Sequence, residues 1–190
     1  MAEKHFSNVV GFDDAPFEKG CRHSVKVVGT VYAGLRFDGV LMGEVEKDGF
    51  DAAARIIDLV EQSRFVSHIR LIMLQGIAFA GFNVVDVFRL HERLRIPVLV
   101  VARKKPDMDA IYRALTTGRI PDGNAKWELI SRLGPMEAVK TVFLQRIGLP
   151  MAQAAAVVER FCIHSNIPEP LRTAHLIASA LSHGQSRGRP

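Results

Sequence analysis

The first third of the chain alternates and clusters its apolar residues as the strands of a sheet do. The stretch Asn8–Phe17 begins with a short apolar run and carries Pro16, which cannot continue a strand. Ser24–Tyr32 is rich in β-branched residues, and Arg36–Glu46 follows it after the turn Ala33-Gly34. These three segments predict an antiparallel meander.

The middle of the chain changes to short continuous apolar runs separated by helical patterns. Ile69–Leu74 and Pro97–Val101 are typical of parallel strands that are buried on both faces. Val139–Gln145 predicts a last, short strand at an edge, and Asn83 is expected to cap the helix that follows it. Helices are predicted over residues 51–63, 84–94, 106–116, 125–133, 150–161 and 167–181.

This order of elements predicts an α/β fold with a mixed five-stranded sheet flanked by helices. Residues 1–190 contain no linker or repeat, so we expect a single domain, with a frayed tail from residue 182 to 190. The chain has 190 residues, of which 48% are hydrophobic and 24% charged, and this is enough to bury one core.

Composition narrows the function only a little. The net charge of +5 favours polyanionic partners such as nucleic acid, although many ordinary basic proteins share it. Cys21 and Cys162 match no metal or redox spacing, which favours a reducing cytoplasm. The N-terminus lacks the apolar core of a signal peptide, and the apolar runs are too short to span a bilayer. We therefore expect a cytoplasmic protein that does not enter membranes.

Acidic residues follow the first predicted strand and precede the first predicted helix. Asp13 and Asp14 would be delivered rigidly at the end of a strand, where carboxylates suit a hard cation such as Mg²⁺ or Mn²⁺. Asp is also common in turns, so the pair fits a structural role before Pro16 equally well. Asp48 and Asp51 fit helix caps as well as they fit ligands.

Five segments together resemble the endonuclease dU family, which is related to endonuclease V. They are Gly11–Phe17, Asp48–Asp51, Gly76–Asp86, Arg103–Asp107 and Ile167–Arg172, and the resemblance extends over nearly the whole chain. The resemblance implies a ribonuclease-H-like, endonuclease V-like fold. It also implies divalent-metal-dependent cleavage of phosphodiester bonds at a deaminated base such as deoxyuridine in DNA, with a role in DNA repair.

The resemblance carries over to particular residues, with one departure. Gly11-Phe-Asp13 matches the Gly-x-Asp motif of endonuclease V, and Asp48 best matches its second acid, with Asp51 and Glu46 as competitors. The third acid is replaced by Gln75, whose amide offers a neutral oxygen without charge. Either such a site holds its metal with fewer acids, or Asp14 or a residue of the last helix compensates for Gln75; our hypothesis is a metal held by Asp13, Asp48 and Asp14. We expect a catalytic set of Asp13, Asp48, Asp14, Asp51 and Glu169; Glu169 fits the late-helix acid of this architecture, and it fits a glutamate that only favours the helix dipole as well.

The substrate is expected to contact a glycine-bearing loop and several cations. These candidate substrate-binding residues are Gln75, Gly76, Phe79, Gly81, Phe82, Arg103, Lys104, Lys105 and Arg172. The phenylalanines would stack on a base and the cations would hold phosphates. Core packing explains the phenylalanines as well, and a solvated charge run explains residues 103–105 as well. His164 and His175 read as structural histidines.

We therefore expect a metal-dependent endonuclease that acts on nucleic acid, with DNA as the expected substrate. Two alternatives stay open: a nucleic-acid-binding protein of the same fold with weakened catalysis, and a small-molecule α/β module that binds phosphate with its glycine loop. The sequence does not indicate an oligomeric state.

Overall fold

The computed structural model describes residues 6–18 and 24–186. Its centre is a sheet in the strand order β3-β2-β1-β4-β7-β9-β8. The strands are β1 (Asn8–Asp14), β2 (Ser24–Ala33), β3 (Arg36–Glu46), β4 (Leu71–Gln75), β7 (Val98–Ala102), β8 (Glu137–Val139) and β9 (Val142–Ile147). Cys21 and residues 187–190 of the expected tail lie outside the described residues.

The pairing of the strands confirms the predicted combination of a meander with parallel units. β1, β2 and β3 pair antiparallel in succession, whereas β1, β4 and β7 pair parallel. The expected number of five strands is wrong, because the sheet has seven strands within residues 6–18 and 24–186. The predicted edge strand over residues 139–145 is in fact a hairpin, β8–β9, which pairs antiparallel with β7.

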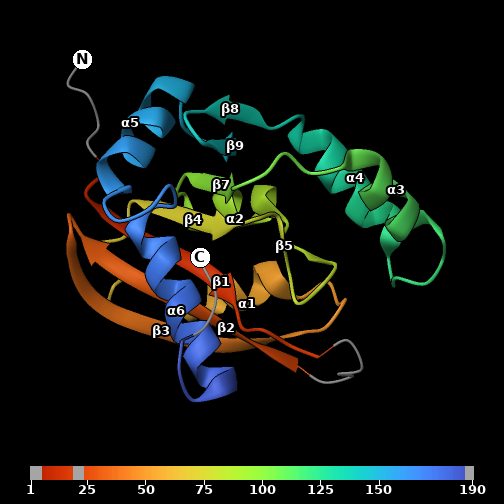
Figure 1. Cartoon of the computed structure of the whole chain (residues 1–190), viewed down its shortest axis with the longest axis horizontal. Coiled ribbons are helices and arrows are strands. Elements are labelled where there is room, and N and C mark those ends of the chain that lie inside the picture. Colours follow the sequence, from red (N-terminus) through yellow and green to blue (C-terminus); the bar gives the residue numbers. More distant parts are fainter. Residues whose placement is uncertain (1–5, 19–23, 187–190) are drawn as a thin grey trace.

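Helices cover both faces of the sheet (Figure 1). They are α1 (Ala52–Glu61), α2 (Val87–Leu94), α3 (Met108–Thr116), α4 (Gly123–Leu133), α5 (Met151–Phe161) and α6 (Glu169–His183). α1 and α2 lie on one face, α5 and α6 on the other, and α3 and α4 form a pair beside the sheet. None of the helices in the described part of the chain has the length and apolar character needed to cross a membrane.

The predicted start of α2 and the predicted end of α6 differ from the structure for local reasons. α2 starts at Val87 rather than residue 84, because β5 (Ala78–Phe79) and β6 (Asn83–Val84) first form a small two-stranded sheet. The cap of α2 is Asp86, whose carboxylate accepts from the Arg89 N–H, and not Asn83. α6 continues to His183 and ends at Gly184 in a left-handed conformation, so the expected tail does not begin at residue 182.

Strand alternation decides which side chains of β1, β4 and β7 face which helices. Odd-numbered residues such as Val9, Leu71 and Leu99 pack with α5 and the start of α6. Even-numbered residues such as Phe12 and Leu74 pack with α1 and α2. Because side chains alternate along a strand, odd-numbered positions at the carboxyl ends of these strands face α6.

Gly11 fixes the position of α6 against the sheet. A Cβ atom at Gly11 would lie 2.7 Å from the Pro170 carbonyl carbon, so only glycine permits this close approach. Thr30 Oγ1 donates to the Pro170 carbonyl at 2.5 Å. Further along, Ser182 Oγ donates to the Pro16 carbonyl at 3.0 Å, so α6 runs in the same direction as β1.

Candidate active site

Asp13 and His175 form a pair at the carboxyl end of β1. Asp13 is only 5% exposed, and its Oδ2 lies 2.9 Å from His175 Nδ1. Its other oxygen, Oδ1, accepts from the Asp14 N–H at 3.0 Å. His175 lies one helical turn after Leu171, which packs beside Gly11, so the α6–β1 contact brings the imidazole over the carboxylate.

Burial shifts the protonation of the two neighbouring acids. Burial raises the pKa of Asp13 above its ordinary value, while the hydrogen bond and charge of His175, and the charge of Arg103, lower it in part. Burial also raises the pKa of Asp14 to about 6, and repulsion from Asp13 adds to this increase. Acids with raised pKa values beside a cationic group are typical of functional sites.

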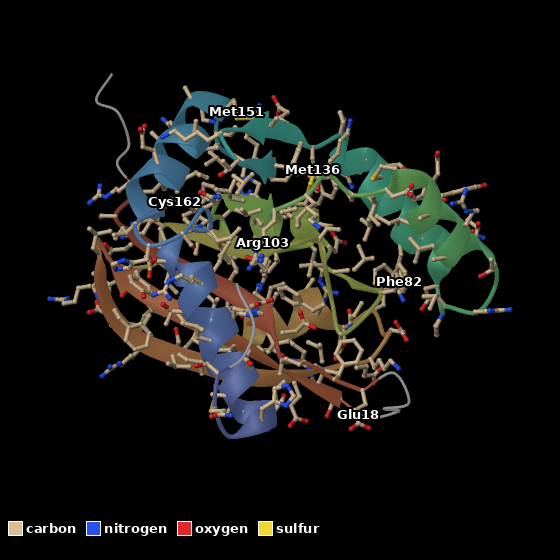
Figure 2. The ribbon with its side chains drawn as sticks, in the orientation of Figure 1. Glu18, Phe82, Arg103, Met136, Met151 and Cys162 are labelled. Atoms are coloured by element: carbon tan, nitrogen blue, oxygen red, sulfur yellow. The ribbon has the colours of Figure 1, made fainter. Side chains whose placement is uncertain are left out.

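Gln75 and Arg103 lie next to Asp13 at the ends of the adjoining parallel strands. Phe12 pairs with Leu74, so Gln75 is the β4 neighbour of Asp13. Within the described part of the chain, the buried Gln75 Oε1 has no hydrogen-bond partner. Arg103 follows β7, and Figure 2 shows its side chain extending toward the end of β1 and α6. We call Asp13, Asp14, Gln75, Arg103 and His175 the carboxyl-end site.

Asp14 and Asp48 hold the glycine-bearing loop on the opposite face. Asp14 Oδ2 accepts from the Ala80 N–H at 2.8 Å, and Asp48 Oδ1 accepts from the Phe82 N–H at 2.9 Å. The Asp48 N–H donates to the Ala80 carbonyl at 2.9 Å. The predicted ligands Asp14 and Asp48 therefore share one loop as a partner, while Asp13 faces α6.

A buried lysine supports the Asp48 turn. Lys126 of α4 is completely buried, and its Nζ donates to the Asp48 carbonyl at 2.8 Å. Burial lowers the pKa of this ammonium group. Asp48 has a left-handed φ of 54°, which Asp tolerates better than most residues, and the lysine contact helps to hold it there.

Asp51 and Glu169 have well-defined partners away from Asp13. Asp51 Oδ1 accepts from Asn83 Nδ2 at 2.7 Å, and Asn83 Oδ1 accepts from the Ala52 N–H at 3.1 Å, so the pair caps α1 across the loop. Glu169 is buried and accepts from Arg172 Nε at 2.9 Å. Catalytic roles for Asp51 and Glu169 stay predictions.

The expected three-acid metal centre also stays a prediction. Among residues 6–18 and 24–186, no group of three or more His, Cys, Asp or Glu side chains is arranged to hold a metal ion. Asp13 and the unpartnered Gln75 Oε1 nonetheless offer two oxygens on one side of the sheet. Mg²⁺ commonly binds through one or two protein oxygens and keeps several waters, so these donors fit it.

The predicted substrate-binding residues are placed unequally. Phe79 is completely buried in the core near α1, which favours its structural interpretation. Phe82 is half-buried beside α3 and α4 (Figure 2). Gly76 and Gly81 both have positive φ angles, of 84° and 87°. Lys104 and Lys105 are exposed.

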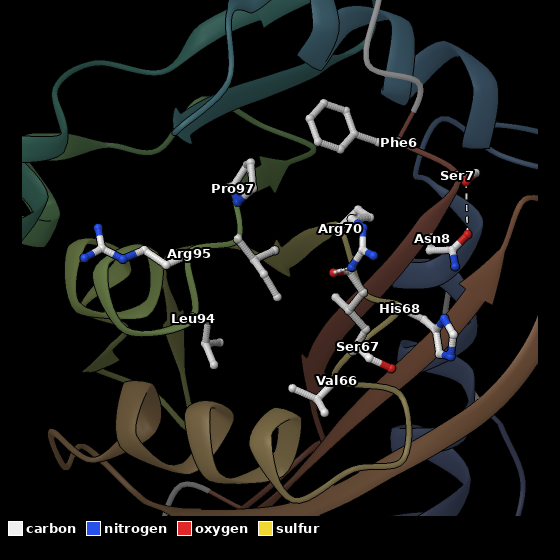
Figure 3. Close-up of a pocket in the computed structure, with 12 residues that line it drawn as sticks. Phe6, Ser7, Asn8, Val66, Ser67, His68, Arg70, Leu94, Arg95 and Pro97 are labelled. Carbon is white, nitrogen blue, oxygen red and sulfur yellow. Dashed lines mark hydrogen bonds between the residues drawn. The ribbon is translucent and has the colours of Figure 1, made fainter.

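A pocket lies at the amino ends of the parallel strands β1, β4 and β7. It has a volume of about 660 Å³ and is lined by residues just before β1, β4 and β7 (Figure 3). Its lining includes His68 and the cations Arg70 and Arg95, and none of the described residues that line it carries a carboxylate. We call it the amino-end pocket.

Comparison with known proteins places the chain in a family. A family model described as endonuclease dU matches residues 5–182. The chain belongs to the endonuclease dU family. A UPF0215 protein of Deinococcus radiodurans is 47% identical over 188 residues, covering 99% of this chain and 95% of its own. A UPF0215 protein of Methanothermobacter thermautotrophicus is 46% identical over 184 residues, covering 95% and 90%.

Solved structures relate the endonuclease dU fold to that of endonuclease V. A protein of unknown function from Archaeoglobus fulgidus matches with a TM-score of 0.85 and 34% identity, over 93% of this chain and 99% of its own. Endonuclease V of Ciona intestinalis, solved with DNA containing an inosine, matches with a TM-score of 0.54 and 14% identity, over 88% and 82%. Human endonuclease V matches with a TM-score of 0.54 and 16% identity, over 91% and 83%. The predicted α/β, ribonuclease-H-like fold is confirmed.

Sequence reasoning missed His175 in this endonuclease dU family member. The histidine was interpreted as structural, yet it is the side chain that contacts the Asp13 carboxylate. A signal was present: Gly11 and Asp13 share one face of a strand, and Leu171 and His175 share one face of a helix. This signal can be interpreted only once the contact between Gly11 and α6 is known.

Proposed function

We propose that the chain is an endonuclease that cleaves nucleic acid, with DNA as substrate, at or beside a deaminated base such as deoxyuridine. Mg²⁺ or Mn²⁺ would be its cofactor. Membership of the endonuclease dU family supports a nuclease. The observation that carries the proposal is the Asp13–His175 pair at the carboxyl ends of the parallel strands, where ligands of open α/β sheets usually bind.

The pair has the chemistry to move a proton. An ionised Asp13 accepts from Nδ1–H of His175, which fixes the ring and leaves Nε2 to accept a proton from a water molecule. His175 remains partly exposed at 26% of its side chain, so water can reach it. The positive charge of Arg103 would stabilise negative charge that develops on a phosphate at this place.

Asp13 and Gln75 Oε1 would hold the divalent ion, with substrate and water oxygens completing its shell. When bound, the ion would supply Lewis-acid activation of the phosphate and a more acidic water. Asp14 would contribute negative charge beside this position, since it is close enough to Asp13 for the two carboxyls to repel. Asp48 would position the loop through the Phe82 N–H.

The loop at residues 76–83 supports recognition of an altered base. Its backbone is held by Asp14 and Asp48, and Phe82 is its half-buried aromatic residue. A half-buried ring next to a rigid backbone can stack on a base that has left its duplex. We therefore assign recognition of the altered base to this loop.

The test is cleavage of a labelled duplex that carries one deoxyuridine, compared with thymidine and inosine duplexes, with and without Mg²⁺. Asp13→Asn removes the carboxylate charge without changing its shape, and we expect nicking at deoxyuridine to fall by at least about 100-fold. Asp38→Asn is the matched control, because Asp38 lies on β3 in an exposed ion pair with Arg36. Equal nicking by the Asp13→Asn variant and the wild type, both folded by thermal melting, would refute the assignment.

One observation favours a second candidate, a nucleic-acid-binding protein of the same fold with weakened catalysis. Gln75 stands where endonuclease V is expected to have an acid, and no three-acid group is arranged for metal in the described ranges. This candidate predicts salt-dependent binding of the duplex without nicking at any Mg²⁺ concentration.

A further inference from the structure

A second cavity adjoins the carboxyl-end site on the α5–α6 face. It has a volume of about 520 Å³ and lies where the loop between α5 and α6 meets the end of β7 and the β8–β9 turn. It is lined by Arg103, Thr141, His164, Ser165, Asn166, Ile167 and Arg172, which we call the basic pocket. Arg103 belongs both to this pocket and to the surroundings of Asp13, whose carboxyl it influences.

The lining of the basic pocket suits a phosphate group. Among the described residues that form it, two are arginines and none carries a carboxylate. Thr141 and Asn166 add a hydroxyl and an amide group that can donate to phosphate oxygens, whereas the Ser165 hydroxyl donates to the Ile167 carbonyl at 3.1 Å.

Arg172 is held in place for such a contact. Its Nε–H bonds to Glu169 at 2.9 Å, and its Nη2 lies 2.8 Å from Glu169 Oε2. Because a guanidinium carries five N–H donors, this pair orients the group and leaves other donors for a ligand. Glu169 therefore acts as a support for Arg172 behind the pocket wall.

The described lining of the pocket is mostly polar and cationic. Ile167 is its apolar residue and His164 its one aromatic ring, and the described lining residues include no phenylalanine, tyrosine or tryptophan. The two guanidinium groups and the hydroxyl and amide donors match phosphate oxygens, so a backbone group fits this cavity better than a base does.

We propose that the basic pocket binds a phosphate of the nucleic-acid strand next to the phosphate that lies at Asp13, and so sets which bond is cut. This inference rests on the proposed endonuclease function, because it takes its substrate class from it. The shared Arg103 links the two positions, and the α5–α6 loop then lies along the path of the strand.

Binding without cleavage tests the pocket separately from the chemistry. We would measure fluorescence anisotropy of a deoxyuridine duplex in EDTA over a series of salt concentrations. The variant is Asn166→Asp with Thr141→Glu, since both residues are exposed and neither side chain has a described hydrogen bond. Asn124→Asp, on the exposed surface of α4, is the matched control.

We expect the double variant to lose about tenfold in affinity, because two carboxylates would face the phosphate. The slope of log affinity against log salt should fall by about 0.9 for the lost phosphate contact. The control should match the wild type in both respects. Unchanged affinity and slope in the double variant, or no duplex binding by the wild type, would overturn the proposal.

A neutral methylphosphonate, placed at one backbone position at a time, identifies the phosphate. The wild type should lose affinity sharply at one position beside the deoxyuridine, and the double variant should lose nothing further there. Additive losses at every position would overturn the pocket assignment. Duplex binding with this pattern but without Mg²⁺-dependent nicking would support the pocket and refute the proposed endonuclease.

Discussion

The two ends of the parallel strands β1, β4 and β7 differ in what they can do. At the amino ends, backbone bonds such as Arg70 N–H to the Asn8 carbonyl, at 2.8 Å, join the segments before the strands. The amino-end pocket there is larger than the basic pocket, about 660 against 520 Å³, and like the basic pocket it has no carboxylate in its described lining (Figure 3). At the carboxyl ends, acids with raised pKa values lie beside an arginine and a histidine.

The difference teaches that the larger pocket and the chemically reactive side chains lie at opposite ends of the same strands. Because β1, β4 and β7 run parallel, the side chains that follow each strand come together at the carboxyl ends, just beyond the last paired residues.

Replacing His175 should have the largest effect. His175→Asn removes the group that faces Asp13 Oδ2, and we expect kcat for deoxyuridine cleavage to fall by about 10²–10⁴-fold. His68→Asn makes the same change at the amino-end pocket and should leave kcat unchanged. Steady-state cleavage assays with both variants check this, and a similar loss in both would break the comparison.

Asp14→Asn should stabilise the protein in a pH-dependent way. The folded pKa of about 6 lies above the ordinary 3.8, so ionising Asp14 costs stability as pH rises through this range. The shift of about 2.2 corresponds to at most about 3 kcal/mol. Urea unfolding in EDTA should therefore show a gain for Asp14→Asn at pH 8 that nearly disappears at pH 4.

The exposed Asp38 provides the contrast for that measurement. Its hydrogen bond with Arg36 lowers the pKa of Asp38, so Asp38→Asn should show no gain that grows with pH. A pH-independent effect of Asp14→Asn would mean that Asp14 ionises in the folded protein as it does in the unfolded chain.

Gly11→Ala should weaken both folding and catalysis. The added methyl would meet Pro170 at 2.7 Å, which we expect to cost about 1–3 kcal/mol and to move α6, and with it His175, away from Asp13. Gly39→Ala is the control, since the atoms nearest to its added methyl belong to the Phe65 ring and not to α6. Unfolding and cleavage should show a loss of both properties for Gly11→Ala, and of stability alone for Gly39→Ala.

Arg95→Gly at the amino-end pocket should have the smallest effect on stability, and it should stabilise the fold where Gly11→Ala destabilises it. Arg95 ends α2 with a left-handed φ of 57°, which glycine adopts more easily, so unfolding should become about 1 kcal/mol less favourable. Cleavage per folded molecule should not change. A change in cleavage would show that the amino-end pocket takes part in the reaction.

Local pattern was enough to predict the strands and most helices, because apolar periodicity acts within each segment. It located Asp13 at a strand end from the neighbouring apolar run and Pro16. It missed contacts that depend on chain segments meeting in space. Asn83 was expected to cap its own helix, but its side chain reaches the start of α1, 31 positions away in sequence.

The strand count and the partner of Asp13 were missed for related reasons. A three-residue strand such as β8 carries little periodicity, and its partner β9 gives it its identity. The Asp13–His175 contact spans 162 positions, and neither residue taken alone predicts it. Gly11 was expected to allow a close neighbour, but which neighbour came only from the fold.

The pairing of the first strand with the last helix has a consequence for synthesis. A ribosome adds His175 162 positions after Asp13, so a growing chain carries the carboxylate long before it carries the imidazole. The partner of Asp13 is thus missing from every incomplete translation product that stops before α6.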